Sequence, residues 1–177
     1  MVAAERLFLD KGVEHTTIEE ITQGAAVSKG AFYLHFSSKA DVIEALRTRF
    51  VQKLLNGIVE EVGKQDTGDW NGKLTAWARA CAMGYLKAAR LHNLVFAASP
   101  PPSREGLTSN ILIDSLQQLL AAGSREGAWS LKEPAFTAIF LFNALHGVVN
   151  QSGIGDDDTG RTKLLSNIED SVLHLAR

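Results

Sequence analysis

The sequence has one cysteine, four prolines and no long apolar run. Cys81 is the single cysteine, so no internal disulfide can form and a cytoplasmic setting is expected. No apolar stretch approaches the ~20 residues that a membrane-spanning helix needs, and the first residues lack the pattern of a signal peptide. Three of the prolines stand together at residues 100–102, which leaves residues 1–99 free of proline, a residue that breaks helices.

The sequence also lacks the common patterns of catalytic and metal sites. No nucleophile–base set, phosphate-binding loop or pair of catalytic carboxylates is visible, so we do not expect an enzyme. The five histidines have no close metal-ligand spacing, and neither a metal nor a cofactor is expected. The acidic run at residues 156–158 is interpreted as a solvated loop before a helix rather than a cation site.

The residues that are present predict an all-α fold. Hydrophobic residues make up 45% of the 177 positions and the net charge is −2, as expected for a globular protein of one domain or two small ones. Apolar residues recur with helical spacing, and no alternating strand pattern appears. Beyond residue 40, helices are predicted at 41–62, 70–98 (with a break near 89–90), 107–126, 134–151 and 162–176, separated by a polar break at 64–68 and loops at 99–106 and 153–160.

Residues 16–39 predict two short helices joined by a tight turn. Thr17 and Glu20 have the spacing of a capping box at the start of the first helix. Residues 24–26 are small and end that helix, and Ser28 can cap a second helix that runs through Leu34. This arrangement is typical of the helix-turn-helix, which places its second helix in the major groove of DNA.

The second helix of this pair is expected to have one buried and one exposed face. Phe32 would point inward, whereas Ser28, Lys29, Gly30 and Tyr33 would stay exposed. A glycine weakens a helix, so Gly30 indicates that something approaches the backbone closely there. A second capping box, Ser38 with Asp41, opens the next helix. Its first turn holds Lys39, a cation that a nearby phosphate would favour.

At these residues the chain resembles the TetR (tetracycline-repressor-like) family of bacterial transcription regulators. The matching positions are Ala4, Leu7, Phe8, Lys11 and Gly12, then Thr16, Thr17 and Ile21, then residues 25–30, and then Phe32, Tyr33, His35, Phe36, Ser38 and Lys39. The resemblance implies an all-helical homodimer with an N-terminal DNA-binding domain, residues 1–40, and a C-terminal effector-binding and dimerisation domain, residues 41–177. It places seven residues on the DNA surface: Thr17, Ser28, Lys29, Gly30, Tyr33, His35 and Lys39. Those expected to meet phosphates are Thr17, Tyr33, His35 and Lys39.

The chain departs from the family pattern at two places. Ala26 stands where the family usually has glycine, which is costly if φ is positive there. Met1 falls inside the expected first helix, so either the start is truncated or the contacts of a preceding basic arm are missing.

The charge of the N-terminal region is not basic, although DNA-binding domains commonly are. Residues 1–50 hold six Lys or Arg and seven Asp or Glu. We expect Lys29, His35 and Lys39 on the recognition side, and the acidic residues Glu14, Glu19, Glu20 and Glu44 facing away. Few phosphates would then be neutralised, so DNA binding should have a modest salt dependence.

The last two helices have the composition of a dimer interface. Residues 134–151 are apolar on more than one face, including Phe136, Phe140, Leu141, Leu145 and Val149, and such a helix must be buried. Paired with the apolar positions Leu164, Leu165, Ile168, Val172 and Leu175, it can form a four-helix interface across a two-fold axis. The alternative is that it is the central helix of a monomer.

Large side chains on the middle helices are candidates for an effector pocket. They are Trp77, Cys81, Tyr85, His92, Phe96, Leu116 and Phe140. An apolar pocket with few polar anchors suits a small lipophilic ligand. Ordinary core packing explains each of them equally well. His92 and His146 can bind a ligand by hydrogen bonds or can be satisfied core or surface histidines.

Three classes of function follow. The first is a DNA-binding regulator, in which a small lipophilic effector releases a repressor from a palindromic operator. The second is a ligand-binding module of the same fold with weakened or lost DNA binding. The third, an enzyme, has no support in the sequence. The expected partners are thus DNA, a small-molecule effector and a second copy of the chain. No association with a membrane is expected.

Overall fold

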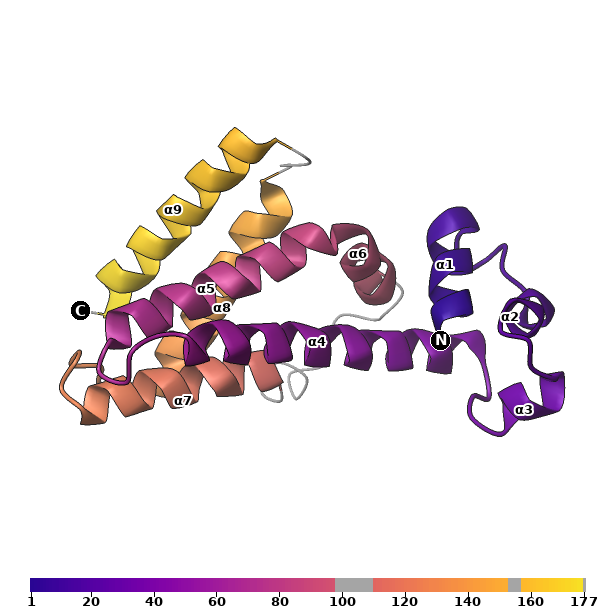
Figure 1. Cartoon of the computed structure of the whole chain (residues 1–177), viewed down its shortest axis with the longest axis horizontal. Coiled ribbons are helices and arrows are strands. Elements are labelled where there is room, and N and C mark those ends of the chain that lie inside the picture. Colours follow the sequence, from indigo (N-terminus) through magenta and orange to yellow (C-terminus); the bar gives the residue numbers. More distant parts are fainter. Residues whose placement is uncertain (98–109, 153–156, 177) are drawn as a thin grey trace. The chain divides into compact units, whose positions relative to one another are not determined.

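The computed structural model describes residues 1–97, 110–152 and 157–176, which form nine α-helices and no strand (Figure 1). The all-α prediction is confirmed for these residues. None of the helices within them is long and apolar enough to cross a membrane. The helices are α1 (Val2–Lys11), α2 (Ile18–Gly24), α3 (Lys29–Tyr33), α4 (Lys39–Gly63), α5 (Trp70–Lys87), α6 (Ala89–Ala97), α7 (Ile111–Arg125), α8 (Pro134–Gln151) and α9 (Asp158–Ala176).

The helices divide between two compact units. The first unit contains Met1–Gln52 together with α6, and the second contains the rest of α4 with α5, α7, α8 and α9. In this division α6 completes the first unit from a distant part of the sequence, and the boundary between functional domains at residue 40 stays a prediction. Val95 of α6 is fully buried in the core of that unit, and the Arg90 guanidinium donates a hydrogen bond to the Leu9 carbonyl at 3.0 Å.

The core of the first unit joins all of its helices. Ala4 and Phe8 of α1 meet Ile21 of α2, Phe32 of α3 and Leu46 of α4 in one buried cluster. Each large apolar side chain buried in this way stabilises the fold by about 1.5–3 kcal/mol. The two short helices therefore depend on tertiary packing, since isolated helices of their length do not form in water.

The second unit is a bundle in which α8 lies against α7 and α9 lies against α5 (Figure 1). Trp77, Cys81 and Tyr85 fall on one face of α5 at intervals of four residues, and all three are buried. Leu116 of α7 is buried as well. The Trp77 indole donates a hydrogen bond to the hydroxyl of Ser115, also on α7, at 3.2 Å.

Several predicted helix ends are confirmed. The break expected near 89–90 lies between α5 and α6, and the polar break at 64–68 separates α4 from α5. The loop predicted at 99–106 and the start predicted at 107 lie outside the described residues, and α7 begins at Ile111 after its cap Asn110.

The predicted end of the loop before the last helix, residue 160, was wrong. The loop predicted at 153–160 includes residues 158–160, which instead form the first turn of α9. The carboxylate of Asp157 accepts hydrogen bonds from the backbone N–H groups of Thr159 and Gly160, both at 3.1 Å. Asp157 therefore caps α9, which explains why residues 158–160 are helical.

Trp129 anchors the chain after α7 and was not singled out from the sequence. Its indole N–H donates to the Leu120 carbonyl at 2.7 Å, and its side chain is buried. The ring lies directly over Gly123. A Cβ atom at that position would stand only 2.6 Å from Cε2 and 2.9 Å from Cη2 of the indole. Gly123 is therefore required by the close approach of Trp129.

We expect Gly123→Ala to destabilise the second unit by about 1–3 kcal/mol, because the added methyl group displaces the indole. The measurement is the midpoint of urea unfolding. The control is Gly57→Ala on α4, where a Cβ meets nothing within 4 Å and the better helix propensity of alanine should stabilise by about 1 kcal/mol. Equal shifts of the midpoint in the two variants would contradict this account.

Candidate nucleic-acid interface

The helix that precedes the turn begins with the predicted capping box. The Glu20 N–H donates to the Thr17 hydroxyl at 3.2 Å, and the Thr17 N–H donates to the Glu20 carboxylate at 2.8 Å. The same carboxylate pairs with the Lys11 ammonium of α1. Hydrogen bonds from Lys11 and then from Thr17 lower the pKa of Glu20 to about 2. This charge is therefore satisfied inside the unit.

The turn between α2 and α3 passes through a left-handed residue. Ala25 ends α2 in the right-handed region, and Ala26 follows with φ of 54°. The Val27 N–H then donates to the Thr22 carbonyl at 3.0 Å, which closes the turn. A left-handed conformation costs a residue with a Cβ atom about 1–2 kcal/mol. The cost expected at Ala26 is therefore present in the structure.

The second helix of the motif presents the predicted residues to solvent. Ser28 caps α3 by accepting from the Ala31 N–H at 3.1 Å, and Phe32 is buried. The helix ends at Tyr33, one residue before the predicted end. The exposed predicted residues on and beside α3 are Ser28, Lys29, Gly30, Tyr33 and His35.

Gly30 has no partner inside the protein that would require a glycine. A Cβ atom added there would meet only the Ser28 hydroxyl, at 3.7 Å, and Gly30 lies in the right-handed helix α3. The position is thus open toward solvent, unlike Gly123. The close approach predicted at Gly30 would have to come from another molecule.

Lys39 holds a loop in place. Its ammonium donates to the carbonyls of Val13 at 2.7 Å, Thr16 at 2.9 Å and Glu14 at 3.4 Å. These bonds tie the start of α4 to the segment between α1 and α2. An ammonium has three donors, so a phosphate contact by Lys39 would have to share or replace one of these bonds. That contact stays a prediction.

The cap of α4 differs in one bond from the predicted capping box. The Asp41 N–H donates to the Ser38 hydroxyl at 3.2 Å as expected. The Asp41 carboxylate, however, accepts from the N–H of Ser37 at 2.8 Å rather than from that of Ser38. Hydrogen bonds from Ser37, followed by one from Ser38, hold the pKa of Asp41 below its ordinary value.

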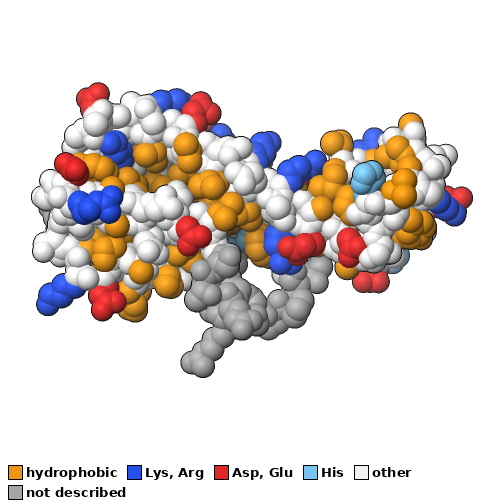
Figure 2. Space-filling model, turned by 90° about the horizontal axis from the view of Figure 1, so that it is seen from below, with side chains coloured by type: hydrophobic (Ala, Val, Ile, Leu, Met, Phe, Trp, Pro, Cys, Tyr) orange, Lys and Arg blue, Asp and Glu red, His pale blue; other side chains and the backbone are white. Residues whose placement is uncertain are grey.

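The prediction that Glu19 faces away from the recognition side was wrong. Its carboxylate lies 3.1 Å from the Lys29 ammonium, across the turn. Glu20 pairs instead with Lys11 of α1, and Glu44 pairs with Arg47 of α4. On the face drawn in Figure 2, Lys and Arg side chains are scattered among Asp and Glu rather than gathered in one basic stripe.

Two exposed apolar side chains beside α3 were missed from the sequence. Leu34 is 83% exposed just after the helix, and Val27 is exposed just before its cap. The signal that would have found them is the position of Phe32, because burying one side chain of so short a helix turns its neighbours outward. In the major groove, apolar groups of this kind contact the methyl group of thymine.

The predicted effector residues divide between the two units, and an effector site made by them stays a prediction. Trp77, Cys81, Tyr85 and Leu116 are buried in the second unit, whereas His92 and Phe96 belong to the first. Phe140 is on the surface of α8, 52% exposed. The positions share apolar character and helical spacing in the sequence, which cannot distinguish a pocket from two separate cores.

Burial changes the titration of three of these groups. Desolvation raises the pKa of the Cys81 thiol, so this cysteine stays protonated and unreactive. Burial, with a smaller effect of Cys81, raises the pKa of Tyr85. Burial also lowers the pKa of His92, whose ring lies 4.7 Å from that of Phe96. The prediction that Cys81 is inert core agrees with its complete burial.

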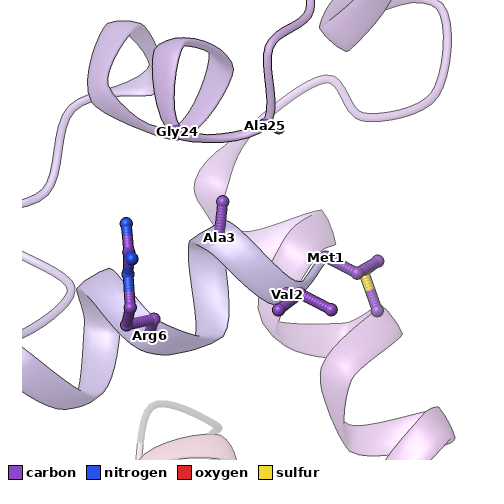
Figure 3. A pocket seen from close by; sticks show the side chains of 6 residues that line it. All are labelled: Met1, Val2, Ala3, Arg6, Gly24 and Ala25. Atoms are coloured by element: carbon purple, nitrogen blue, oxygen red, sulfur yellow. The ribbon is translucent and has the colours of Figure 1, made fainter.

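One hollow of the first unit lies between α1 and the end of α2 (Figure 3). It has a volume of about 320 Å³ and is partly open to solvent. The side chains of Ala3 and Arg6 point from α1 toward the backbone at Gly24 and Ala25 (Figure 3). None of the predicted effector residues lines it. Among the described residues, no cluster of three or more His, Cys, Asp or Glu is arranged to hold a metal ion.

Residues 1–46, which contain the whole motif, match the family model of the bacterial regulatory proteins of the tetR family. Over these residues the chain is similar to the TetR family. It is 42% identical over 55 residues to the HTH-type transcriptional repressor BepR of Brucella suis, covering 30% of this chain and 26% of that protein. It is 48% identical over 44 residues to the HTH-type transcriptional regulator TtgR of Pseudomonas putida, covering 25% of this chain and 21% of that protein. The matches thus span about a quarter of the length of these curated relatives.

Solved structures extend the similarity of fold over nearly all of this chain. PfmR of Thermus thermophilus, a TetR-family transcriptional regulator, matches with a TM-score of 0.70 at 19% identity, covering 97% of this chain and 95% of that one. The fatty acid degradation regulator FadR of Bacillus halodurans matches with a TM-score of 0.74 at 20% identity and the same coverage. The all-α, TetR-like fold is therefore confirmed.

We expect Ala26→Gly to stabilise the first unit by about 0.5–1 kcal/mol, because glycine relieves the left-handed strain at the turn at a smaller cost in chain entropy. Ala25→Gly is the matched control. Ala25 is right-handed with φ of −94°, so a glycine there should destabilise by about 0.5–1 kcal/mol. Urea unfolding followed by circular dichroism measures both. A loss of stability in both variants would mean that the turn is not strained.

Proposed function

We propose that this chain is a ligand-responsive DNA-binding transcriptional regulator, a repressor that a small lipophilic effector releases from a palindromic operator. The observation that carries the proposal is the exposed face of α3. Lys29, Gly30 and Tyr33 lie in solvent there, and Gly30 has open space above it that the protein does not use. A helix N-terminus with a bare backbone is suited to approach phosphates and base edges closely.

The similar proteins support this function. BepR is named a repressor and TtgR a transcriptional regulator, and they match over 55 and 44 residues of this chain. The family model matches residues 1–46, which make the capped helices and the turn. Because the family model covers only residues 1–46 and these two relatives match over 30% and 25% of the chain, the matches support DNA binding rather than the nature of the effector.

The effector part of the proposal rests on the apolar interior of the second unit. Trp77, Cys81, Tyr85 and Leu116 are buried there. The ring of Tyr85 lies 5.0 Å from that of His146 on α8, in an edge-to-face arrangement. These two residues would supply the polar anchors for a ligand that is otherwise lipophilic. The ligand would bind one conformation of the protein better than the other and so change its affinity for DNA.

The dimer part of the proposal rests on the outer face of α8. Phe136 is 65% exposed and stacks on Phe140 with ring centroids 6.4 Å apart, and Ile139 and Val148 are exposed as well. Leu141, Leu145 and Val149 of the same helix are buried within the chain. A second copy would cover the exposed face, and a two-fold dimer would place two recognition helices on a palindromic site.

A second candidate function is a ligand-binding module with weakened DNA binding. Two observations favour it: the Lys39 ammonium is engaged by three carbonyls, and Glu19 places a carboxylate beside Lys29. Both reduce the positive charge available to phosphates. The two candidate functions predict different affinities for DNA, so a direct measurement of that affinity distinguishes them.

We expect the chain to bind duplex DNA taken from beside its own coding region, with an affinity that falls as salt is raised. In the same titrations Gly30→Ala should bind more weakly by at least 10-fold, because its methyl group occupies the space where the DNA backbone or a base edge approaches. It should nevertheless be more stable by about 1 kcal/mol, because alanine favours a helix.

Gly57→Ala is the control for this experiment, since it gains the same helix propensity at an exposed position of the second unit. It should bind DNA like the parent. If the parent binds no fragment at any salt concentration, the regulator is excluded and the ligand-binding module remains. Parent-like binding by Gly30→Ala would show that DNA does not approach α3 at this residue.

We expect Phe140→Asp to shift the chain from dimer to monomer, because a charge placed in an apolar interface loses its hydration without a partner. Sedimentation equilibrium measures the dissociation constant, which should rise at least 100-fold. Val59→Asp is the control, because Val59 is an exposed apolar residue of α4 outside α8 and α9. A monomeric parent, or equal effects in both variants, would contradict the interface.

A further inference from the structure

Glu19 and Lys29 form an ion pair across the helix-turn-helix. Glu19 is in the first turn of α2, and Lys29 is the first residue of α3. Their side chains are 73% and 58% exposed, and the two charged groups lie 3.1 Å apart. An exposed pair of this kind contributes only about 0–1 kcal/mol to stability. It is therefore free to exchange its partners when another molecule arrives.

Glu19 differs in this respect from its neighbour Glu20. The Glu20 carboxylate accepts from the Thr17 backbone and from Lys11, and it is part of a helix cap. The Glu19 carboxylate has no part in that cap and faces Lys29 at the surface. If Lys29 turned to DNA, Glu19 would keep its charge beside the groove without a cation.

A carboxylate in the major groove needs a hydrogen-bond donor. Ionised carboxylates only accept, so guanine O6 and N7, thymine O4 and the phosphates all repel one. Cytosine offers its N4 amino group and adenine its N6 amino group. The partner of cytosine, guanine, presents the two acceptors O6 and N7 to a lysine, whereas the partner of adenine, thymine, presents O4 alone. The two halves of one cytosine–guanine pair thus complement a carboxylate and an ammonium that stand side by side.

We propose that Glu19 and Lys29 together read one cytosine–guanine base pair in each half-site, with Glu19 accepting from cytosine N4 and Lys29 donating to the guanine. Glu19 is then a specificity-determining residue. It rejects a thymine or guanine at the cytosine position, because the carboxylate would face an acceptor there. The inference rests on the proposed DNA binding and adds the class of base that this pair selects.

The pair also explains why an acidic residue is compatible with the recognition side. Away from a matching base pair, Glu19 repels phosphates and neutralises Lys29, which weakens binding to DNA of unrelated sequence. At a matching base pair both charges find partners, and the penalty disappears. Discrimination thus comes from a penalty on wrong sequences as well as from a contact to the right one.

The test is selection of duplexes from a library with randomised half-sites by the full chain. The parent should enrich one cytosine–guanine pair in each half-site. Glu19→Gln, which removes the charge and adds a donor, should lose about 5- to 150-fold of the preference for cytosine at that position. Lys29→Met should lose the preference for guanine at the same base pair. Glu14→Gln, an equal change of charge at an exposed loop residue, should keep the parent's preference.

Each alternative result has a distinct meaning. If Glu19→Gln strengthens binding to all sequences alike and keeps the cytosine preference, Glu19 acts only by repelling phosphates and the inference is overturned. Loss of preference at different base pairs in Glu19→Gln and Lys29→Met overturns it as well. If the parent selects no sequence and binds no DNA, the proposed function fails and the inference fails with it. Equal unfolding midpoints for parent and Glu19→Gln separate these results from a folding defect.

Discussion

Burial of Phe32 is the constraint on which the candidate interface depends. It is the one buried residue in the five-residue helix α3, and its ring meets a core that α1, α2, α4 and α6 build together. A helix this short cannot form alone, so the packing of one ring both stabilises α3 and sets its rotation. Because Phe32 points into the core, the helix is rotated so that Lys29, Gly30 and Tyr33 face solvent.

The polar groups around this core are of two kinds: those that cap helices or hold loops, and those that pair at the surface. Side chains that end or start helices are satisfied within the first unit: Thr17 with Glu20, Ser28 with the Ala31 N–H, and Lys39 with loop carbonyls. The Lys29–Glu19 pair lies outside these caps. Cap bonds hold backbone groups that would otherwise be unsatisfied, whereas an exposed ion pair can be exchanged at little cost. The fold thus separates the groups that build the motif from those available to a ligand.

Much of the fold could be predicted, because helix caps and apolar spacing are local signals. The capping box at Thr17, the start of α8 at Pro134 and the break after Lys87 all follow from residues within a few positions of one another. The membership of α6 in the first unit could not be predicted, since Val95 reaches a core whose other buried residues lie at least 49 positions away in the chain. Trp129 was missed for a similar reason, because its significance comes from its contact with Gly123.

The sequence by itself determined the all-α class, the capped helix pair and the TetR resemblance. Each of these depends on the spacing of residues that lie only a few positions apart. Only the tertiary structure decided which charges and pockets belong together. It placed Glu19 on Lys29, engaged Lys39 with the loop before α2, and divided the predicted effector residues between two units. The physical reason is that side-chain partners are chosen by the rotation and packing of helices. Both arise from burial over the whole unit, and a local pattern cannot specify them.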